Sequence, residues 1–107
     1  MIHKCHAHGC EVAVPPAMFA CKPHWFSLPK AMRDAIRREC RPGQERNKNP
    51  SARYLAVQQR AIGMMAFRPN DENAAAIAAH YTFRAEQWRL RAIDGGHGDP
   101  LAFLEGP

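Results

Sequence analysis

The sequence contains no apolar run close to the roughly 20 residues that a membrane-spanning helix needs. Its first residues, Met1–Cys5, also lack the apolar core of a secretory signal. We therefore expect a cytoplasmic protein without a membrane partner, in a compartment that keeps thiols reduced. In that setting the four cysteines are better explained as metal ligands, with one thiol to spare, than as two disulfides.

Positive charge is scarce in the second half of the chain. Residues 61–107 contain four Arg against six Asp and Glu, whereas residues 1–60 contain eleven Lys and Arg against four acids. The two parts therefore carry net charges of −2 and +7, which give the overall +5. A basic half joined to a mildly acidic half suggests a face suited to an anionic surface, either a nucleic acid or an acidic protein.

Nothing in the composition indicates a disordered or fibrous protein, because 46% apolar and 23% charged residues are ordinary for a globular chain. A length of 107 residues predicts one domain. A domain of this size buries a modest share of its surface, so a bound metal ion would matter to its stability.

The spacing of apolar residues predicts a mainly α fold, in which an N-terminal zinc knuckle packs on three helices, the third of them long. The expected helices span residues 29–40, 51–67 and 71–93. Small polar residues precede each of them and are expected to act as N-caps, namely Ser27, Ser51 and Asn70.

The expected domain covers residues 1–94. Its first part, residues 1–26, is the knuckle, in which Val12–Val14 could form one short strand. Its second part, residues 27–94, contains the helices. Residues 95–107 form a Gly- and Pro-rich tail that could dock on the domain or on a partner.

Two spaced ligand pairs indicate a metal site. Four residues separate Cys5 from Cys10, two separate Cys21 from His24, and ten lie between the pairs. Tetrahedral zinc sites use such short chelating pairs joined by a loop. Gly9 precedes Cys10, where a tight knuckle has to turn its amides toward a sulfur. The sequence therefore predicts a structural Zn²⁺ bound by these four residues in a treble-clef-like module.

The identity of the first ligand stays open, because three histidines crowd the first pair: His3, His6 and His8. Any of them could replace Cys5 or contact a ligand from outside. The remaining cysteine, Cys40, is expected to be a small buried hydrophobic residue. The aromatic pair Trp25 and Phe26 follows ligand His24 and is expected to form a small core over the zinc.

Catalysis is not expected at this site. Three thiolates and one histidine leave no open position for a reactive water, and Glu11 is the only acid nearby in the sequence. A metal-dependent nuclease of the His-Asn-His kind also uses a treble clef, but its asparagine and second histidine are missing at the matching positions. We therefore expect neither an enzyme nor a small-molecule substrate.

A basic stretch covers the first expected helix and the loop that follows it. Its candidate residues for binding a nucleic acid or an acidic partner are Lys30, Arg33, Arg37, Arg38, Arg41, Arg46 and Lys48. Arg53 and Arg60 continue it into the second helix. An ordinary solvated helix face explains the same residues, and aromatic residues do not interleave with the charges in the sequence.

Several short motifs occur in an order that resembles a family of small zinc-binding proteins encoded by phages and prophages, without assigned function. The motifs are Val14-Pro15-Pro16-Ala17-Met18, Cys21-Lys22-Pro23-His24-Trp25-Phe26, Leu28-Pro29, Arg33, Arg41-Pro42-Gly43-Gln44-Glu45 and Pro50-Ser51-Ala52-Arg53-Tyr54-Leu55. The match covers residues 5–62, and it implies the same four ligands as the spacing.

The chain departs from this family after Ile62, because family members end soon after the second helix. The added helix and tail could supply a specialised binding surface. By analogy with phage inhibitors such as anti-CRISPR proteins, the resemblance implies a protein that binds and blocks a host protein or nucleoprotein complex in the host cytosol. Direct binding of DNA or RNA through the basic helices is the alternative, and a metal-dependent nuclease is the third, least favoured one.

Overall fold

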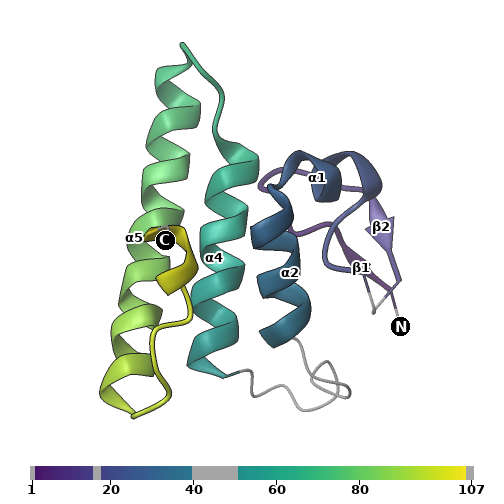
Figure 1. Cartoon of the computed structure of the whole chain (residues 1–107). Helices are drawn as coiled ribbons and strands as arrows, with labels where there is room; N and C mark the ends of the chain where they lie inside the picture. Colours follow the sequence, from purple (N-terminus) through teal and green to yellow (C-terminus); the bar gives the residue numbers. More distant parts are fainter. Residues whose placement is uncertain (1, 16–17, 40–50, 106–107) are drawn as a thin grey trace.

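The computed structural model describes residues 2–15, 18–39 and 51–105. In this part the chain is mainly helical, with two very short strands before the first helix (Figure 1). The prediction of a mainly α fold is therefore confirmed. Four residues to which the sequence gave a role lie outside the described residues, namely Cys40, Arg41, Arg46 and Lys48.

The N-terminal strands form a minimal antiparallel pair. Strand β1 (His3–Lys4) lies against β2 (Ala13–Val14), with His3 opposite Val14. The N–H of Cys5 extends the pairing by donating to the carbonyl of Val12, at 2.8 Å. Two residues per strand are too few for a strand pair to be stable alone, so this segment depends on the packing of its side chains against the rest of the fold.

A short helix, α1 (Lys22–Ser27), follows, and the sequence did not predict it. Its first turn contains Pro23, whose missing N–H costs nothing there. The expected N-cap role of Ser27 is wrong: this residue ends α1, and its hydroxyl donates to the carbonyl of His24. Helix α2 (Lys30–Glu39) begins directly after Pro29, close to the predicted range.

The two longest helices form an antiparallel hairpin, with α2 on the other flank of α4 (Figure 1). Helix α4 (Ala52–Ala66) is capped by Ser51, whose hydroxyl accepts the N–H of Tyr54 at 3.1 Å, as predicted. Helix α5 (Glu72–Asp94) is capped by Asp71 instead of the expected residue, Asn70, which takes a positive φ of 64°.

Small residues allow α4 and α5 to approach closely. The buried positions of α5 are all alanines: Ala74, Ala78, Ala85 and Ala92. They face the buried side of α4, where Gly63 lies directly against α5. A Cβ atom at position 63 would lie 3.1 Å from the carbonyl oxygen of Ala78 and 3.3 Å from the Cβ of Tyr81.

Gly63→Ala is therefore expected to destabilise the hairpin, although alanine is the better helix former at an exposed position. Both close atoms belong to or adjoin the α5 backbone and cannot move without shifting the helix. We expect a net loss of about 1–2 kcal/mol and a fall in Tm of about 5–10 °C. Thermal unfolding followed by circular dichroism measures the change, and a rise in Tm would contradict the close helix contact.

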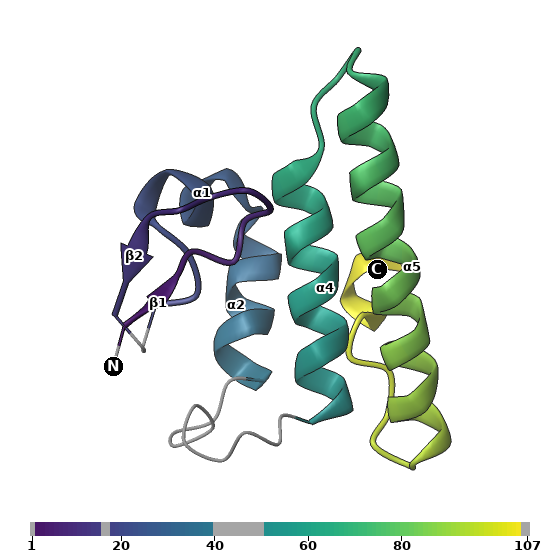
Figure 2. The same cartoon turned by 180° about the vertical axis from the view of Figure 1, so that it is seen from behind.

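The tail packs back onto the helical hairpin rather than extending away from it. Figures 1 and 2 place it on one face of α4 and α5, ending in a single turn, η1 (Ala102–Glu105). Pro100 and Leu101 are buried there. Asp99 pairs with Arg89 of α5 at 2.9 Å, and the carbonyl of His97 accepts from Arg53 of α4. The tail is thus part of the folded unit.

Candidate metal centre

Three thiols and one imidazole converge at the N-terminal end of the fold. The Sγ atoms of Cys5, Cys10 and Cys21 and a ring nitrogen of His24 all lie within 4.8 Å of one another. The Nδ1 atom of His24 is 3.1 Å from the sulfur of Cys21 and 3.6 Å from that of Cys5. Ligands of a tetrahedral zinc ion are separated by roughly 3.5–3.8 Å. The arrangement is therefore compatible with a bound metal ion.

The first ligand pair is positioned by a tight turn. The N–H of Cys10 donates to the carbonyl of Ala7 at 3.0 Å, and Gly9 takes a φ of 79°, which side chains disfavour. Within this turn the N–H of Ala7 points at the sulfur of Cys5, at 3.5 Å. The prediction that Gly9 allows a knuckle whose amides face a sulfur is confirmed.

The second pair lies at the start of α1. Cys21 is the N-cap, in an extended conformation, and its carbonyl accepts the N–H of Trp25 at 2.8 Å. One helical turn brings His24 back over Cys21, because residues three apart share a helix face. This short helix, which the sequence did not predict, therefore orients Cys21 and His24 toward the first pair.

The surroundings shift the thiol pKa values in opposite directions. Burial raises the pKa of Cys5, against the opposing effect of the Ala7 N–H. The backbone N–H of His24 lowers the pKa of Cys21, because a hydrogen bond to the sulfur favours the thiolate. A cysteine binds a metal ion as the thiolate, so the backbone around Cys21 favours the form of the side chain that binds a metal, whereas burial opposes that form at Cys5.

Aromatic rings close one side of the cluster. The ring of His6 packs on Phe19 with centroids 4.7 Å apart, and burial lowers the pKa of this histidine. Phe19 is buried and lies 6.4 Å from the half-buried ring of Trp25. The expectation that Phe26 joins this small core is wrong, because its side chain is 64% exposed.

The three histidines that could have replaced Cys5 have other contacts. His3 donates to the carbonyl of Lys4 at 2.8 Å, and His6 covers Phe19. His8 extends to α5, where its Nδ1 lies 3.0 Å from the hydroxyl of Tyr81. Among the described residues, the group that could hold an ion contains only the four predicted ligands. Glu11 is not in it and pairs with Lys4 at the surface.

In the structure, the described side chains of the basic stretch differ in the partners that they contact. Lys30 pairs with Asp34 at 2.8 Å. Arg33 lies over the ring of Phe26 and Arg37 over that of Trp25, each with its guanidinium carbon 5.3 Å from the ring centroid. The statement that aromatic residues do not interleave with these charges is therefore wrong for the folded chain.

The remaining arginines of this stretch are engaged within the fold. Arg38 lies over the ring of Phe103 in the tail, with its Nε 3.5 Å from Glu39. Arg53 forms a two-pronged pair with the buried Glu39. Arg33 and Arg37 therefore lie against aromatic rings of α1, whereas Arg38 lies against the tail.

Comparison of the chain with models of protein families, with curated proteins and with solved structures gave no match.

Among the described residues, no helix is both long enough and apolar enough to cross a bilayer.

Proposed function

We propose that Cys5, Cys10, Cys21 and His24 hold a structural Zn²⁺ in a treble-clef-like module, and that the chain is a non-catalytic binding protein. The observation that carries the proposal is the composition of the cluster, three sulfurs and one nitrogen within 4.8 Å of one another. Such a soft ligand set suits zinc, and four protein ligands complete its tetrahedral shell. A reactive water would then have no position on the ion.

The structural role follows from where the cluster lies. It joins the β1–β2 pair to α1, and neither segment is long enough to be stable by itself. Two of the ligands, Cys5 and Cys21, belong to the same buried cluster as Leu28 and Met32, which lead into α2. The ion therefore acts as a cross-link between the strand pair and α1, which is connected to α2 through the buried Leu28.

The proposed binding surface lies beside this cross-link and is called the α1–α2 face, defined here as Phe26, Arg33 and Arg37. Arg33 lies over the exposed ring of Phe26, and Arg37 lies over the neighbouring ring of Trp25. Aromatic residues and arginine are enriched at protein interfaces. We propose that this face attaches the chain to a host protein or nucleoprotein complex and blocks it. The resemblance to small phage-encoded zinc proteins supports that choice of partner by analogy.

The double variant Phe26→Ala/Arg37→Glu tests this proposal. Tagged wild-type chain, purified from cells that naturally encode it, is expected to retain one stoichiometric partner. The double variant should lose that partner by at least tenfold, about 1.4 kcal/mol, while its metal content and Tm stay unchanged. The matched control is Ala75→Glu, which adds a negative charge at an exposed position of α5 and should keep the partner. Equal recovery by all three proteins would remove the α1–α2 face as the binding surface.

Direct binding of nucleic acid through the same face is the second candidate. It is favoured by the stacked Arg33–Phe26 and Arg37–Trp25 pairs, because arginines beside aromatic rings suit a phosphate chain with bases. This candidate predicts that Arg37→Glu abolishes binding of purified protein to nucleic acid at low salt, without any host protein.

A further inference from the structure

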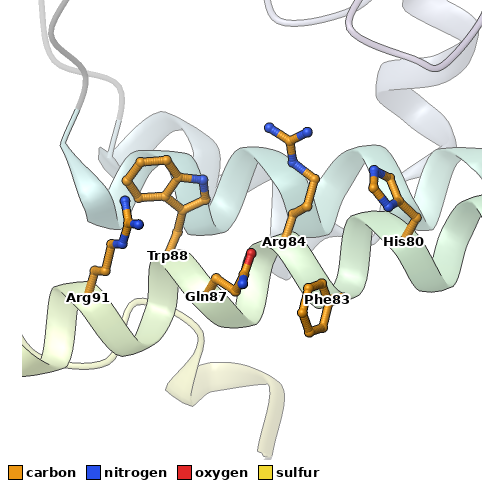
Figure 3. Close-up of a pocket in the computed structure, with 6 residues that line it drawn as sticks. All are labelled: His80, Phe83, Arg84, Gln87, Trp88 and Arg91. Carbon is orange, nitrogen blue, oxygen red and sulfur yellow. The ribbon is translucent and has the colours of Figure 1, made fainter.

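A shallow groove runs along the outer side of α5, on a surface that the α1–α2 face does not share. Six side chains line it, and it encloses about 360 Å³ (Figure 3): His80, Phe83, Arg84, Gln87, Trp88 and Arg91. Figure 3 shows Arg84, Trp88 and His80 projecting from the same side of the helix, with Phe83 at the opposite edge. The tail occupies a different face of α5 and leaves the groove open.

The groove is positively charged although the second half of the chain is acidic overall. No acidic residue is among its lining side chains, which include two arginines and a histidine. Two acids near the groove have a partner outside it: Glu86 of α5 and Asp99 of the tail both pair with Arg89. Neither acid is paired with Arg84 or Arg91 there, and both of these arginines are exposed.

The aromatic content of the groove indicates what kind of anion it fits. The guanidinium of Arg91 lies over the indole of Trp88, 4.7 Å from its centroid. The phenyl ring of Phe83 is 62% exposed. The lining contains no aliphatic side chain, whereas grooves that dock helical peptides use aliphatic anchors. Flat rings alternating with arginines are typical of surfaces on which bases stack while phosphates are neutralised.

We propose that this groove binds single-stranded nucleic acid, with bases stacked on Trp88 and Phe83 and phosphates held by Arg84 and Arg91. The two arginines are seven residues apart, about 10 Å along the helix, so they face phosphates that are not adjacent in the strand. The amide of Gln87, between them, can donate to or accept from a base edge. This site is separate from the α1–α2 face, and either can fail without the other.

Fluorescence anisotropy with the zinc-loaded full chain and a labelled 12-nucleotide oligothymidylate tests the proposal. The strand is expected to bind at low salt, with an affinity that falls as salt rises. Arg84→Gln and Arg91→Gln should each lower the slope of log K against log salt by roughly 0.7. Phe83→Ala, at an exposed position, should weaken binding by about tenfold or more. Trp88→Leu should weaken it similarly, and circular dichroism checks that both variants remain folded.

The control is Ala75→Glu, at an exposed position of α5 outside the groove, which should reduce binding of the strand by no more than about twofold, the general effect of one unit of net charge. The proposal is overturned if the strand does not bind at low salt. It is also overturned if Arg37→Glu abolishes binding while Phe83→Ala does not, which assigns the strand to the α1–α2 face. Equal affinity for polyglutamate, sensitive to the same substitutions, would show a site for acidic peptides instead.

Discussion

Removal of the metal is expected to unfold the N-terminal part of the chain, residues 2–28. A strong chelator, or the substitution Cys21→Ser, should lower the free energy of unfolding by at least about 5 kcal/mol, because binding of a structural zinc contributes about 10–16 kcal/mol to small metal domains. For a domain of this size, a loss of that order corresponds to a fall in Tm of about 20 °C or more. Differential scanning calorimetry with and without chelator measures it.

The reason for so large an effect lies in the buried contacts that the cluster organises. Phe19, Ala20 and Val14 are buried around it, yet the secondary structure that holds them consists of two-residue strands and a six-residue helix. Without the ion, the three thiols and the imidazole would remain partly desolvated, with only weak hydrogen bonds to sulfur in compensation. The helical hairpin of α4 and α5 should keep much of its helicity, so the loss in far-ultraviolet circular dichroism is expected to be partial.

His3→Gln provides the matched control for Cys21→Ser. His3 lies in the same segment but outside the cluster, so this variant should keep its metal and its Tm within about 3 °C of the wild type. Loss of metal from His3→Gln with retention in Cys5→Ser would show that a histidine replaces Cys5 as the ligand.

Substitution of Glu39 is expected to have the second largest effect. This carboxylate of α2 is only 8% exposed and accepts two hydrogen bonds from Arg53 of α4, at 2.9 and 3.0 Å. Arg53 also donates to the carbonyl of His97, so one guanidinium joins α2, α4 and the tail. Glu39→Gln would remove the negative charge that faces Arg53 and leave at most one acceptor at this position for its guanidinium. Because Arg53 keeps 27% of its side chain exposed, we expect a loss of about 2–3 kcal/mol, below that of a fully buried pair.

The same pair makes stability depend on pH in a defined direction. The hydrogen bonds from Arg53 lower the pKa of Glu39 despite its burial. The unfolded chain therefore binds the proton more readily, and the contribution is complete above the unfolded pKa of about 4.3. It is lost as pH falls through the lower pKa of the folded state. Urea unfolding at pH 7 and pH 3 should show a smaller difference between wild type and Glu39→Gln at the lower pH. A constant difference would contradict the role of the ionised pair.

The two proposed binding surfaces lie on different elements of the fold. The α1–α2 face belongs to α1 and α2, whereas the groove is on α5. Figure 2 shows α4 between α2 and α5. A chain attached to a nucleoprotein complex could therefore use one surface for protein and the other for an exposed strand. The separate variants Phe26→Ala/Arg37→Glu and Phe83→Ala distinguish the two contributions.

Local sequence signals predicted the long elements well. Apolar spacing and a serine cap placed α4 within one residue at each end, and Pro29 marked the start of α2. The clustering of Cys5, Cys10, Cys21 and His24 was also predictable, because two closely spaced Cys/His pairs are a specific signal and depend on few long-range contacts. Within α5, alanines take the buried positions, and Ala78 lies directly against Gly63 of α4.

Other features depended on contacts that the sequence does not reveal. Helix α1 is six residues long, which is too short to show a helical period of apolar residues in the sequence. Its single turn brings His24 back to Cys21. The pairing of Arg33 with Phe26 joins residues of two different helices. The positive groove on α5 was hidden by a net charge that counted Glu86 and Asp99, both of which pair with Arg89. The ion pairs of the folded chain, rather than its composition, determine which charged side chains remain available at the surface.

X-ray absorption at the zinc edge of the purified protein tests the metal centre most directly. The proposed centre predicts one zinc per chain, with three sulfur neighbours at about 2.3 Å and one nitrogen at about 2.0–2.1 Å. Cys10→Ser should reduce the sulfur count to two. A native protein without stoichiometric zinc, or a zinc shell dominated by nitrogen and oxygen, would contradict the assignment of Cys5, Cys10, Cys21 and His24 as the ligands.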